Sequence, residues 1–519
     1  MAAVSDVIAA EPAIPLSDAL ALGEEEGDRF ERAFARAAGS ALTKCNAVRL
    51  LLDARENFPA WLTAIADAKH YVLFESYIIA DDDIGHEFIA ALAEKARAGV
   101  RVCVVYDWLG STKFSRPWEP LRAAGAEVRC FNPPSVESPL AWLTRDHRKS
   151  IVVDGEVAFV SGLCVSSAWV GDPQRRLEPW RDTGVELRGD AVADIESAFA
   201  QVWRTCGGEP LQLAQPALRR AGGIRVRVIA GVPNSAATYR TDLLVASLAR
   251  EHLWLTDAYF VATSAYTQSL RAAASDGVDV RLLVPGASDV PAVSPLSRAG
   301  YRALLEAGVR VFEWNGTMLH AKTAVADRRW SRVGSTNLNL VSWISNYELD
   351  VAIEDVAFAE AMANQYEKDL AQATEIVLTS RNRVRRSEPR VPTEAQAAAA
   401  RRAMSGSAGR AAAGAVSVGS ALGAALTNRR TLAPAETGLL TIVAIITICI
   451  AIIAAWFPRI LAWPVAVLCG WLGVAWAWKA WTLWRKPSTA RPGEPPQRGA
   501  PAPPSEDRAR NAIIDNSRP

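Results

Sequence analysis

The chain repeats its own pattern once, and this repeat constrains the fold more than any other feature of the sequence. A helix end, a glycine and a buried strand follow one another at 98–105, and the same order returns at 276–284. A second pattern of this kind at 124–132 returns at 307–315. Glycine just beyond a helix supplies the left-handed cap, and the β-branched run after it supplies the strand. A repeat this long is not a solenoid, so we expect two similar halves that face each other.

Helical patterns alternate with these strands in both copies. They are expected at about 56–69 and 84–98 in the first copy, and at about 236–250 and 263–275 in the second. Strands that alternate with helices predict an α/β fold, here with largely parallel pairing. Hydrophobic residues make up 50% of the chain and charged residues 22%, which allows a sizeable buried core and excludes wholesale disorder.

We therefore divide the chain into six parts. Two duplicated α/β halves, expected at 45–210 and 211–380, pack as one pseudo-two-fold body. The other parts are an acidic N-terminal extension (1–44), a basic Arg- and Ala-rich linker (381–437), a transmembrane helical hairpin (438–478) and a Pro- and Arg-rich disordered tail (487–519).

The hairpin is predicted from two uncharged apolar runs, 438–457 and 460–478. Each has the length that crosses roughly 30 Å of hydrocarbon, and only Pro458 and Arg459 separate them. The alternative, a pair of buried core helices, is disfavoured because neither run has a polar face. Arg and Lys flank the outer ends of the two runs, so the positive-inside rule places both ends and the α/β body on the cytoplasmic side.

Charge and cysteine usage exclude several classes of protein. The net charge is +1, yet residues 381–430 hold ten Arg and two Glu, so the rest of the chain is mildly acidic. A nucleic-acid binder would carry a broad cationic surface, whereas a basic stretch beside a membrane anchor either binds anionic lipid or is a solvated linker. The seven cysteines include no C-x-x-C pair, which argues against a zinc site or a disulfide framework and indicates a reducing compartment. The N-terminus lacks the basic and apolar regions of a signal peptide.

Two of the five histidines lie in the same sequence context, one in each copy of the repeat. The stretches from His147 to Asp154 and from His320 to Asp327 both read H-x-K-x4-D. On a strand, residues i and i+2 project from the same face, so each histidine stands beside a lysine. An imidazole next to a fixed ammonium suits phosphoryl transfer, which needs a nucleophile or proton donor and a cation for the phosphate oxygens. Two such motifs, in register with an independent repeat, indicate one site built from both halves.

The paired motif resembles that of the phospholipase D superfamily, and the resemblance covers most of 45–378. In particular the chain is similar to bacterial cardiolipin synthases, in the shorter forms without N-terminal membrane spans. Segments outside the motifs carry this likeness: Gly334-Ser335-Thr336-Asn337, Asn346-Tyr347-Glu348, Trp180-Arg181-Asp182-Thr183, Phe74-Glu75, Asp83-Ile84-Gly85 and Asp257-Ala258-Tyr259-Phe260.

The resemblance implies that the two histidines act on one phosphodiester. His147 is expected to attack phosphorus and form a phosphohistidine, while His320 protonates the leaving alcohol and then deprotonates the incoming one. Asp182 and Glu348 are expected to accept a hydrogen bond from the second ring nitrogen of a histidine, which fixes its tautomer. The aspartate that closes each motif is expected to tie its strand to neighbouring backbone.

The resemblance also implies how the phosphate is held. Lys149 and Lys322 are expected to bind the non-bridging oxygens, with further hydrogen bonds from Ser335 and Asn337. Cys164 departs from this pattern, because it stands where the first half should have the equivalent of Asn337, and a thiol is a poor donor. No metal ion and no other cofactor is implied, since lysine and histidine already supply the charge.

The leading hypothesis is a membrane-anchored phosphatidyltransferase that joins two phosphatidylglycerol molecules and releases glycerol. Its expected partners are phospholipids (phosphatidylglycerol or another phosphatidyl donor) and the membrane, with no nucleic acid, and its expected location is the bacterial cytoplasmic membrane. A hydrolytic phospholipase D would differ only in whether water or a lipid alcohol takes the phosphatidyl group. A catalytically weak membrane scaffold of the same fold is a third hypothesis, which the intact His and Lys of both motifs oppose.

Overall fold

The computed structural model describes residues 24–112, 118–135, 141–174, 177–211, 221–290, 293–378 and 384–386, with short stretches between 456 and 478. The chain divides into two compact units, Met1–Pro458 and Arg459–Pro519. The expected tail, nearly all of the expected linker and most of the expected hairpin (438–478) lie outside the described residues. Among the helices that are described, none has both the length and the hydropathy needed to cross a bilayer.

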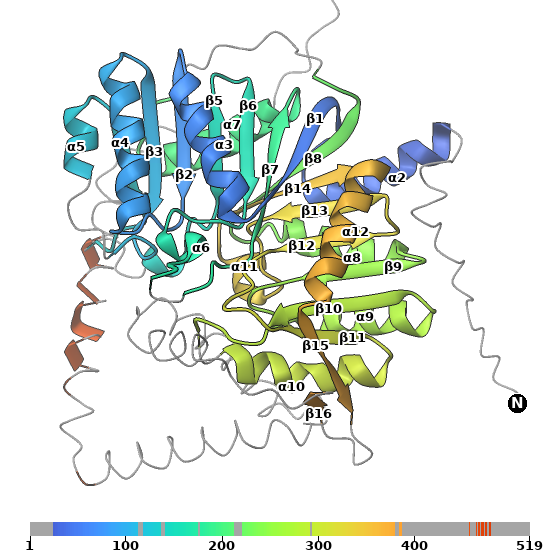
Figure 1. Cartoon of the computed structure of the whole chain (residues 1–519). Helices are drawn as coiled ribbons and strands as arrows, with labels where there is room; N and C mark the ends of the chain where they lie inside the picture. The colour runs from blue at the N-terminus through green and yellow to red at the C-terminus, as the bar shows by residue number, and fades with distance from the viewer. Residues whose placement is uncertain are drawn as a thin grey trace, which may run out of the picture. The chain divides into compact units, whose positions relative to one another are not determined.

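A single 16-stranded sheet runs through the first compact unit (Figure 1). Its order is β16-β15-β11-β10-β9-β12-β13-β14-β8-β1-β7-β6-β5-β2-β3-β4. The first half of the repeat contributes β1 (Thr43–Leu52), β2 (Tyr71–Ser76), β3 (Arg101–Asp107), β4 (Glu127–Phe131), β5 (Lys149–Val153), β6 (Val157–Ser161) and β7 (Thr183–Arg188). The second contributes β8 (Ile224–Gly231), β9 (His252–Thr256), β10 (Asp279–Pro285), β11 (Arg310–Trp314), β12 (Thr323–Ala326), β13 (Trp330–Gly334), β14 (Glu348–Glu354), β15 (Ala373–Leu378) and β16 (Val384–Arg386). Because β1 pairs with β8 and the order of each half mirrors the other, the predicted duplication is confirmed.

The prediction of largely parallel pairing is wrong. Parallel pairs are confined to β2-β3-β4 and β9-β10-β11, and the other strands of the sheet pair antiparallel. The parallel strands β2 and β3 are joined through α4 (Asp83–Arg97), and β9 and β10 through α9 (Ser264–Ser275). A crossover helix returns the chain to the same end of the sheet, whereas the tight turns after β5 and β12 reverse its direction. The motif strands are therefore antiparallel to their neighbours.

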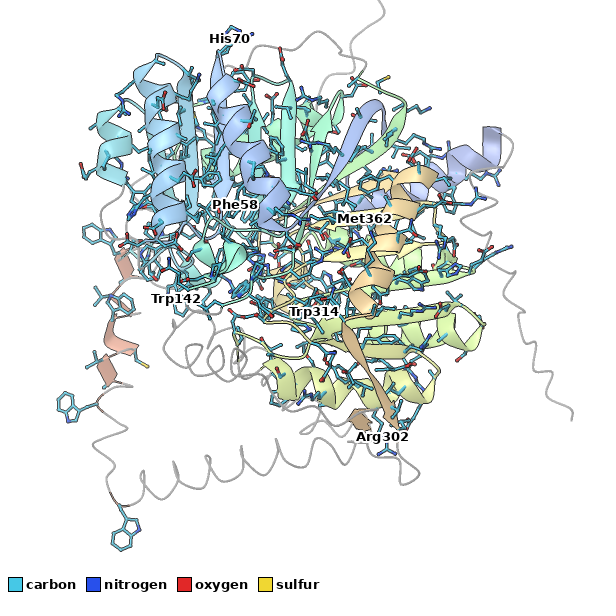
Figure 2. The ribbon with its side chains drawn as sticks, in the orientation of Figure 1. Phe58, His70, Trp142, Arg302, Trp314 and Met362 are labelled. Atoms are coloured by element: carbon cyan, nitrogen blue, oxygen red, sulfur yellow. The ribbon has the colours of Figure 1, made fainter. Side chains whose placement is uncertain are left out.

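Helices cover both faces of the sheet, and the two faces join the halves differently. On one face α7 (Ala191–Thr205) and α12 (Val356–Leu370) contribute Phe199 and Met362 to one apolar cluster that includes strands of both halves. Met362 is labelled on α12 in Figure 2. On the other face α3 (Asp53–Asp67) and α4 cover the first half, while α8 (Ala237–Leu248) and α9 cover the second, in two separate clusters. These four helices confirm the predicted helical segments. The shared cluster explains why the halves form one body.

One helix breaks the symmetry of the repeat. Within the expected acidic extension, α2 (Glu24–Ala38) forms a helix that packs against α8. Its Glu31 pairs with the buried Arg227 of β8 at 2.7 Å. At the matching place in the first half Arg49 bonds to Glu186 of the adjacent strand, whereas Arg227 lies opposite Ala352. In the second half, α2 thus supplies the carboxylate that pairs with the arginine, because the adjacent strand has an alanine at this position.

The remaining helices are short or lie at the edges of the sheet. Among the residues described between 24 and 386 they are α5 (Trp118–Ala123), α6 (Ser167–Val170), α10 (Val293–Glu306), α11 (Leu340–Ile344) and the 3₁₀ turn η1 (Ala141–Leu143). In Figure 1, α6 and α11 lie at the junction of the two halves. There they border the site described next.

Candidate active site

The two motif histidines each stand directly before a buried central strand. His147 precedes β5 and His320 precedes β12. Each is held by the backbone of the opposite half, because the amide of His147 donates to the carbonyl of Tyr347 (2.9 Å) and the amide of His320 donates to the carbonyl of Arg181 (2.7 Å). The two halves are thereby joined at the motifs themselves.

Each imidazole also takes its carboxylate from the opposite half. Nδ1 of His147 lies 2.9 Å from Oε2 of Glu348, and Nδ1 of His320 lies 2.8 Å from Oδ2 of Asp182. The side chains of both histidines are buried, with 7% and 5% of the residue exposed. When Nδ1 donates to the carboxylate, Nε2 keeps its lone pair for chemistry. The predicted carboxylate partners are therefore in contact with the rings, in a crossed arrangement.

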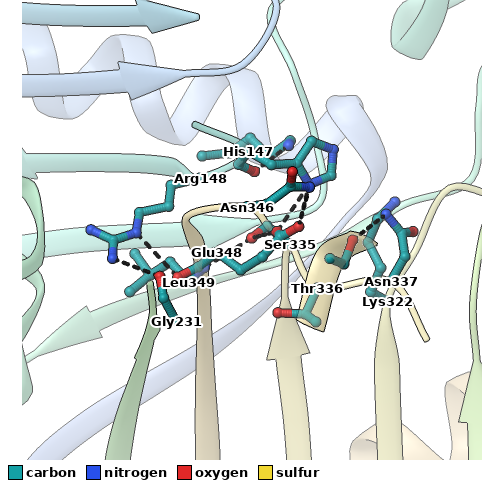
Figure 3. A network of polar contacts seen from close by, with 12 residues as sticks. His147, Arg148, Gly231, Lys322, Ser335, Thr336, Asn337, Asn346, Glu348 and Leu349 are labelled. Carbon is teal, nitrogen blue, oxygen red and sulfur yellow. Dashed lines mark hydrogen bonds and ion pairs between the residues drawn. The ribbon is translucent and has the colours of Figure 1, made fainter. Parts of the chain in front are cut away.

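The two carboxylates are held by further donors. Glu348 accepts from Ser335 Oγ (2.6 Å) and from Asn346 Nδ2 (3.1 Å), as Figure 3 shows. Asp182 accepts from the indole of Trp169 (2.8 Å). A Cβ at Gly162 would lie 2.2 Å from Oδ1 of Asp182, so the glycine leaves room for this carboxylate. Ser335, expected at the phosphate oxygens, instead donates to Glu348 and accepts from the amide of Leu349, which places it one layer behind the histidine.

The motif lysines lie behind the histidines. Nζ of Lys149 donates to the carbonyl of His147, and Nζ of Lys322 donates to the carbonyl of His320. Each ammonium also lies over a tyrosine ring, Lys149 at 5.1 Å from the centroid of Tyr77 and Lys322 at 5.8 Å from that of Tyr259. The tyrosines, one beyond the end of β2 and the other beyond β9, were not predicted; their matching places after corresponding strands were the available signal.

Burial and the two lysines control protonation in the site. Burial, followed by the charges of Lys149 and Lys322, holds the pKa of His147 well below its usual value. Burial and Lys322 lower the pKa of His320 to about 4, against the opposing effect of Asp182. Burial also lowers the pKa of Lys322 to about 8.

The two carboxylates differ from each other. Burial raises the pKa of Glu348 to about 7. Burial acts in the same direction on Asp182, but His320, the charge of Lys322 and the hydrogen bond from Trp169 together outweigh it and bring the pKa of Asp182 below its usual value. Asp182 is thus a better partner for an imidazolium than Glu348, while the lowered pKa of each histidine keeps both imidazoles neutral near pH 7 in the free enzyme.

Both histidines open into one pocket of about 470 Å³. Cys164 lines it from the first half and Asn337 from the second, as their matching sequence positions predict. Oδ1 of Asn337 has no hydrogen-bond partner within the described part of the chain. Trp169 and Trp180 pack around His320, with ring centroids at 5.2 and 5.6 Å. The two imidazoles therefore share one cavity.

The motif aspartates point away from this pocket. Asp154 accepts hydrogen bonds from the amides of residues 69–71, and Asp327 from those of residues 250–252. Each carboxylate ties the turn after its strand to the start of the neighbouring antiparallel strand, β2 beside β5 and β9 beside β12, at the opposite end from the histidine. Across the described ranges, no three His, Cys, Asp or Glu side chains are grouped so as to hold a metal ion.

Two buried arginines, neither predicted as a site residue, connect the halves. Arg148 donates to the carbonyls of Glu348 (3.1 Å), Ala198 (2.7 Å) and Gly231 (3.0 Å), and Figure 3 shows the bonds to Glu348 and Gly231. Arg181 pairs with Asp369 of α12 at 3.0 Å. Because Arg148 is the variable residue of the motif, the motif spacing gives no indication of its role.

Known proteins that resemble this chain match it in both halves of the repeat. The family described as "Cardiolipin synthase, PLD-like domain" matches residues 61–171 and 245–370, one segment in each half. Cardiolipin synthase A of Pseudomonas aeruginosa is 34% identical over 375 residues, which are 72% of this chain and 76% of the relative. Cardiolipin synthase of Alkalihalophilus pseudofirmus is 32% identical over 63% of this chain and 67% of its own. Phosphatidylserine synthase of Haemophilus influenzae shares the fold, with a TM-score of 0.52 and 14% identity over 66% of this chain and 91% of that one.

Proposed function

Because this chain belongs to the cardiolipin synthase family of phospholipase D-like proteins, we propose that it is a phosphatidyltransferase that makes cardiolipin. Two phosphatidylglycerol molecules are its substrates, and cardiolipin and glycerol are its products. The observation that carries the proposal is the crossed pair of dyads, His147 with Glu348 and His320 with Asp182, facing one pocket. An inactive scaffold would not require two buried imidazoles with a fixed tautomer.

In the first step Nε2 of His147 attacks phosphorus of the donor lipid. The N–P bond forms, the P–O bond to the glycerol headgroup breaks, and His320 gives the leaving oxygen a proton. The negative charge of the bound phosphodiester offsets the two lysines and raises the pKa of His320, and Asp182 stabilises the resulting imidazolium. The lower pKa of Asp182 and the raised pKa of Glu348 support this division of roles.

In the second step a second phosphatidylglycerol supplies the nucleophile. His320 removes the proton from its headgroup hydroxyl, the alkoxide oxygen attacks phosphorus, and the N–P bond to His147 breaks. The proton that His320 gave to glycerol is replaced by the one it takes from the acceptor, so the enzyme returns to its starting state. Each lysine gives one donor to a histidine carbonyl, and Lys322 also lies 3.0 Å from Nδ1 of His320; the donors that remain are directed to the non-bridging oxygens.

The test is the product formed from phosphatidylglycerol as the only lipid. The full chain, reconstituted in vesicles, should yield cardiolipin and free glycerol in equal amounts. Predominant phosphatidic acid would show that water wins the second step and would make the enzyme a hydrolase. His147→Ala and His320→Ala should each lower the rate by more than about 10²-fold, the loss typical of one acid–base group. Near-normal synthesis by either variant would contradict a shared site.

We also propose that residues 438–478 anchor the enzyme in the bacterial cytoplasmic membrane, with the α/β body on the cytoplasmic side. The support is the absence of charge from the two runs 438–457 and 460–478, and the Arg and Lys that flank their outer ends. Truncation after Ser380 should release the body from carbonate-washed membranes. Retention of the truncated chain would show that these residues are not the sole anchor.

A further inference from the structure

Three exposed apolar side chains are close sequence neighbours of residues that line the active-site pocket. Leu143 is 43% exposed, Val170 45% and Leu340 40%. Each lies next to, or two positions from, a residue that lines the pocket. Those lining residues are Arg145, Trp169 and Val341. Single exposed apolar residues are common on any protein, but three around one opening are a feature of that opening.

The three side chains come from both halves. Leu143 ends η1, just before the first motif; Val170 ends α6, and Leu340 begins α11. The two short helices follow the motif hairpins of their respective halves, and each is capped by a polar side chain, Ser166 for α6 and Asn339 for α11. Figure 1 places α6 and α11 at the junction of the halves, and Figure 2 places Trp142, the neighbour of Leu143, near α6. We call Leu143, Val170 and Leu340 the pocket rim.

We propose that the pocket rim docks on the surface of a lipid bilayer, so that a phospholipid enters the pocket headgroup first while its acyl chains stay in the membrane. This inference rests on the proposed function and adds the surface by which the substrate arrives. A freely soluble substrate would gain nothing from an apolar rim. A phospholipid with two acyl chains gains binding energy from such a rim. Its phosphate must reach two histidines that are 93–95% buried, and the apolar rim lets its acyl chains stay out of water while it does so.

The size and place of the rim favour a membrane over a protein partner. Three side chains around an opening fall far short of the roughly 1,000 Å² that a stable protein interface buries. A protein seated there would also close the pocket that both histidines share. A bilayer both covers the rim and delivers the substrate. Since the rim is built from both halves, the pseudo-two-fold axis of the body then points toward the membrane, and donor and acceptor lipid meet similar walls.

The test compares two forms of the same substrate. The full chain and its triple variant Leu143→Ser/Val170→Ser/Leu340→Ser are assayed on dihexanoyl phosphatidylglycerol dissolved as monomers, and on long-chain phosphatidylglycerol in proteoliposomes. We expect the variant to keep its rate on the monomers within about twofold. In proteoliposomes it should lose about tenfold or more, because three apolar side chains no longer favour the interface.

The matched control is Val356→Ser/Val377→Ser. These two valines are 49% and 39% exposed and, unlike the rim residues, have no pocket-lining residue within two positions in the sequence, so this double variant should retain full activity on both substrates. As a measurement independent of catalysis, hydrogen exchange in proteoliposomes should be slower at residues 141–145, 167–171 and 340–345 in the unmodified chain than in the triple variant.

The outcomes separate the two proposals. Equal proteoliposome rates and equal exchange in the triple variant and the control would overturn docking by the rim, even with cardiolipin formed normally. A change of oligomeric state without a change in proteoliposome rate would make the rim a contact between copies and would also overturn it. Failure of the unmodified chain to make cardiolipin from either substrate would overturn the proposed function, while the exchange experiment would still decide the docking.

Discussion

The crossed dyads predict a specific effect of Glu348→Gln. The glutamine side chain has the shape of the glutamate, so Ser335 and Asn346 keep a partner and the fold is retained. What changes is the group that faces Nδ1 of His147, now 2.9 Å from a carboxylate oxygen. If the amide turns its NH₂ to the ring, Nδ1 must accept, and Nε2 then carries the proton. His147 thereby loses the lone pair with which it attacks phosphorus.

The expected fall in kcat depends on how much the Glu348 carboxylate contributes to catalysis by holding the tautomer of His147. Replacing the carboxylate behind a catalytic histidine by its amide costs about 10⁴-fold where the wrong tautomer results. At pH 7.5, close to its pKa of about 7, Glu348 is only partly ionised, so the carboxylate contributes somewhat less here than a fully ionised one. We expect kcat to fall by about 10²- to 10⁴-fold, which corresponds to about 2.7–5.4 kcal/mol of barrier.

The assay is cardiolipin formation at pH 7.5, together with single-turnover trapping of labelled phosphatidyl groups on the protein. Glu348→Gln should lower both, because formation of the covalent intermediate itself is impaired. The control is Glu367→Gln, which changes an exposed glutamate on α12 and should leave both unchanged. The tautomer argument would be refuted if a folded Glu348→Gln enzyme kept more than about a tenth of the normal rate.

Three further predictions follow from the site. The profile of kcat/KM against pH should be bell-shaped, falling below about pH 7 as Glu348 is protonated and above about pH 8 as Lys322 loses its charge; a flat profile from pH 6 to 9 would contradict these roles. Arg148→Met should lower the free energy of unfolding by about 2–4 kcal/mol in a denaturant titration, because buried carbonyls of both halves lose their hydrogen-bond donor. An unchanged midpoint would show that the hydrogen bonds of Arg148 do not stabilise the contact between the halves. Cys164→Asn should lower KM for phosphatidylglycerol by about 3- to 10-fold with little effect on kcat, since an amide donor replaces a thiol in the pocket wall; a raised KM would mean that the thiol contributes to fit instead.

The sequence was most informative where the signal is local. Glycine caps, β-branched runs and the spacing of the two motifs depend on residues only a few positions apart, so the duplication, the α/β class and four helices could be predicted. The motifs also pointed to His147 and His320 without any knowledge of the fold. Each of these features depends on residues that are close together in the sequence, so the sequence alone is enough to recognise it.

Only the tertiary structure showed the contacts between residues that are far apart in the sequence. His147 and Glu348 are 201 positions apart, and His320 and Asp182 are 138 apart, so no local pattern could show that each histidine takes its carboxylate from the other half. Ser335 lies within a recognisable segment, but only packing places its hydroxyl on Glu348 rather than on the phosphate. The rim around the pocket has the same origin. It forms when the two halves bury one shared apolar cluster, and that burial brings together side chains that the sequence keeps far apart.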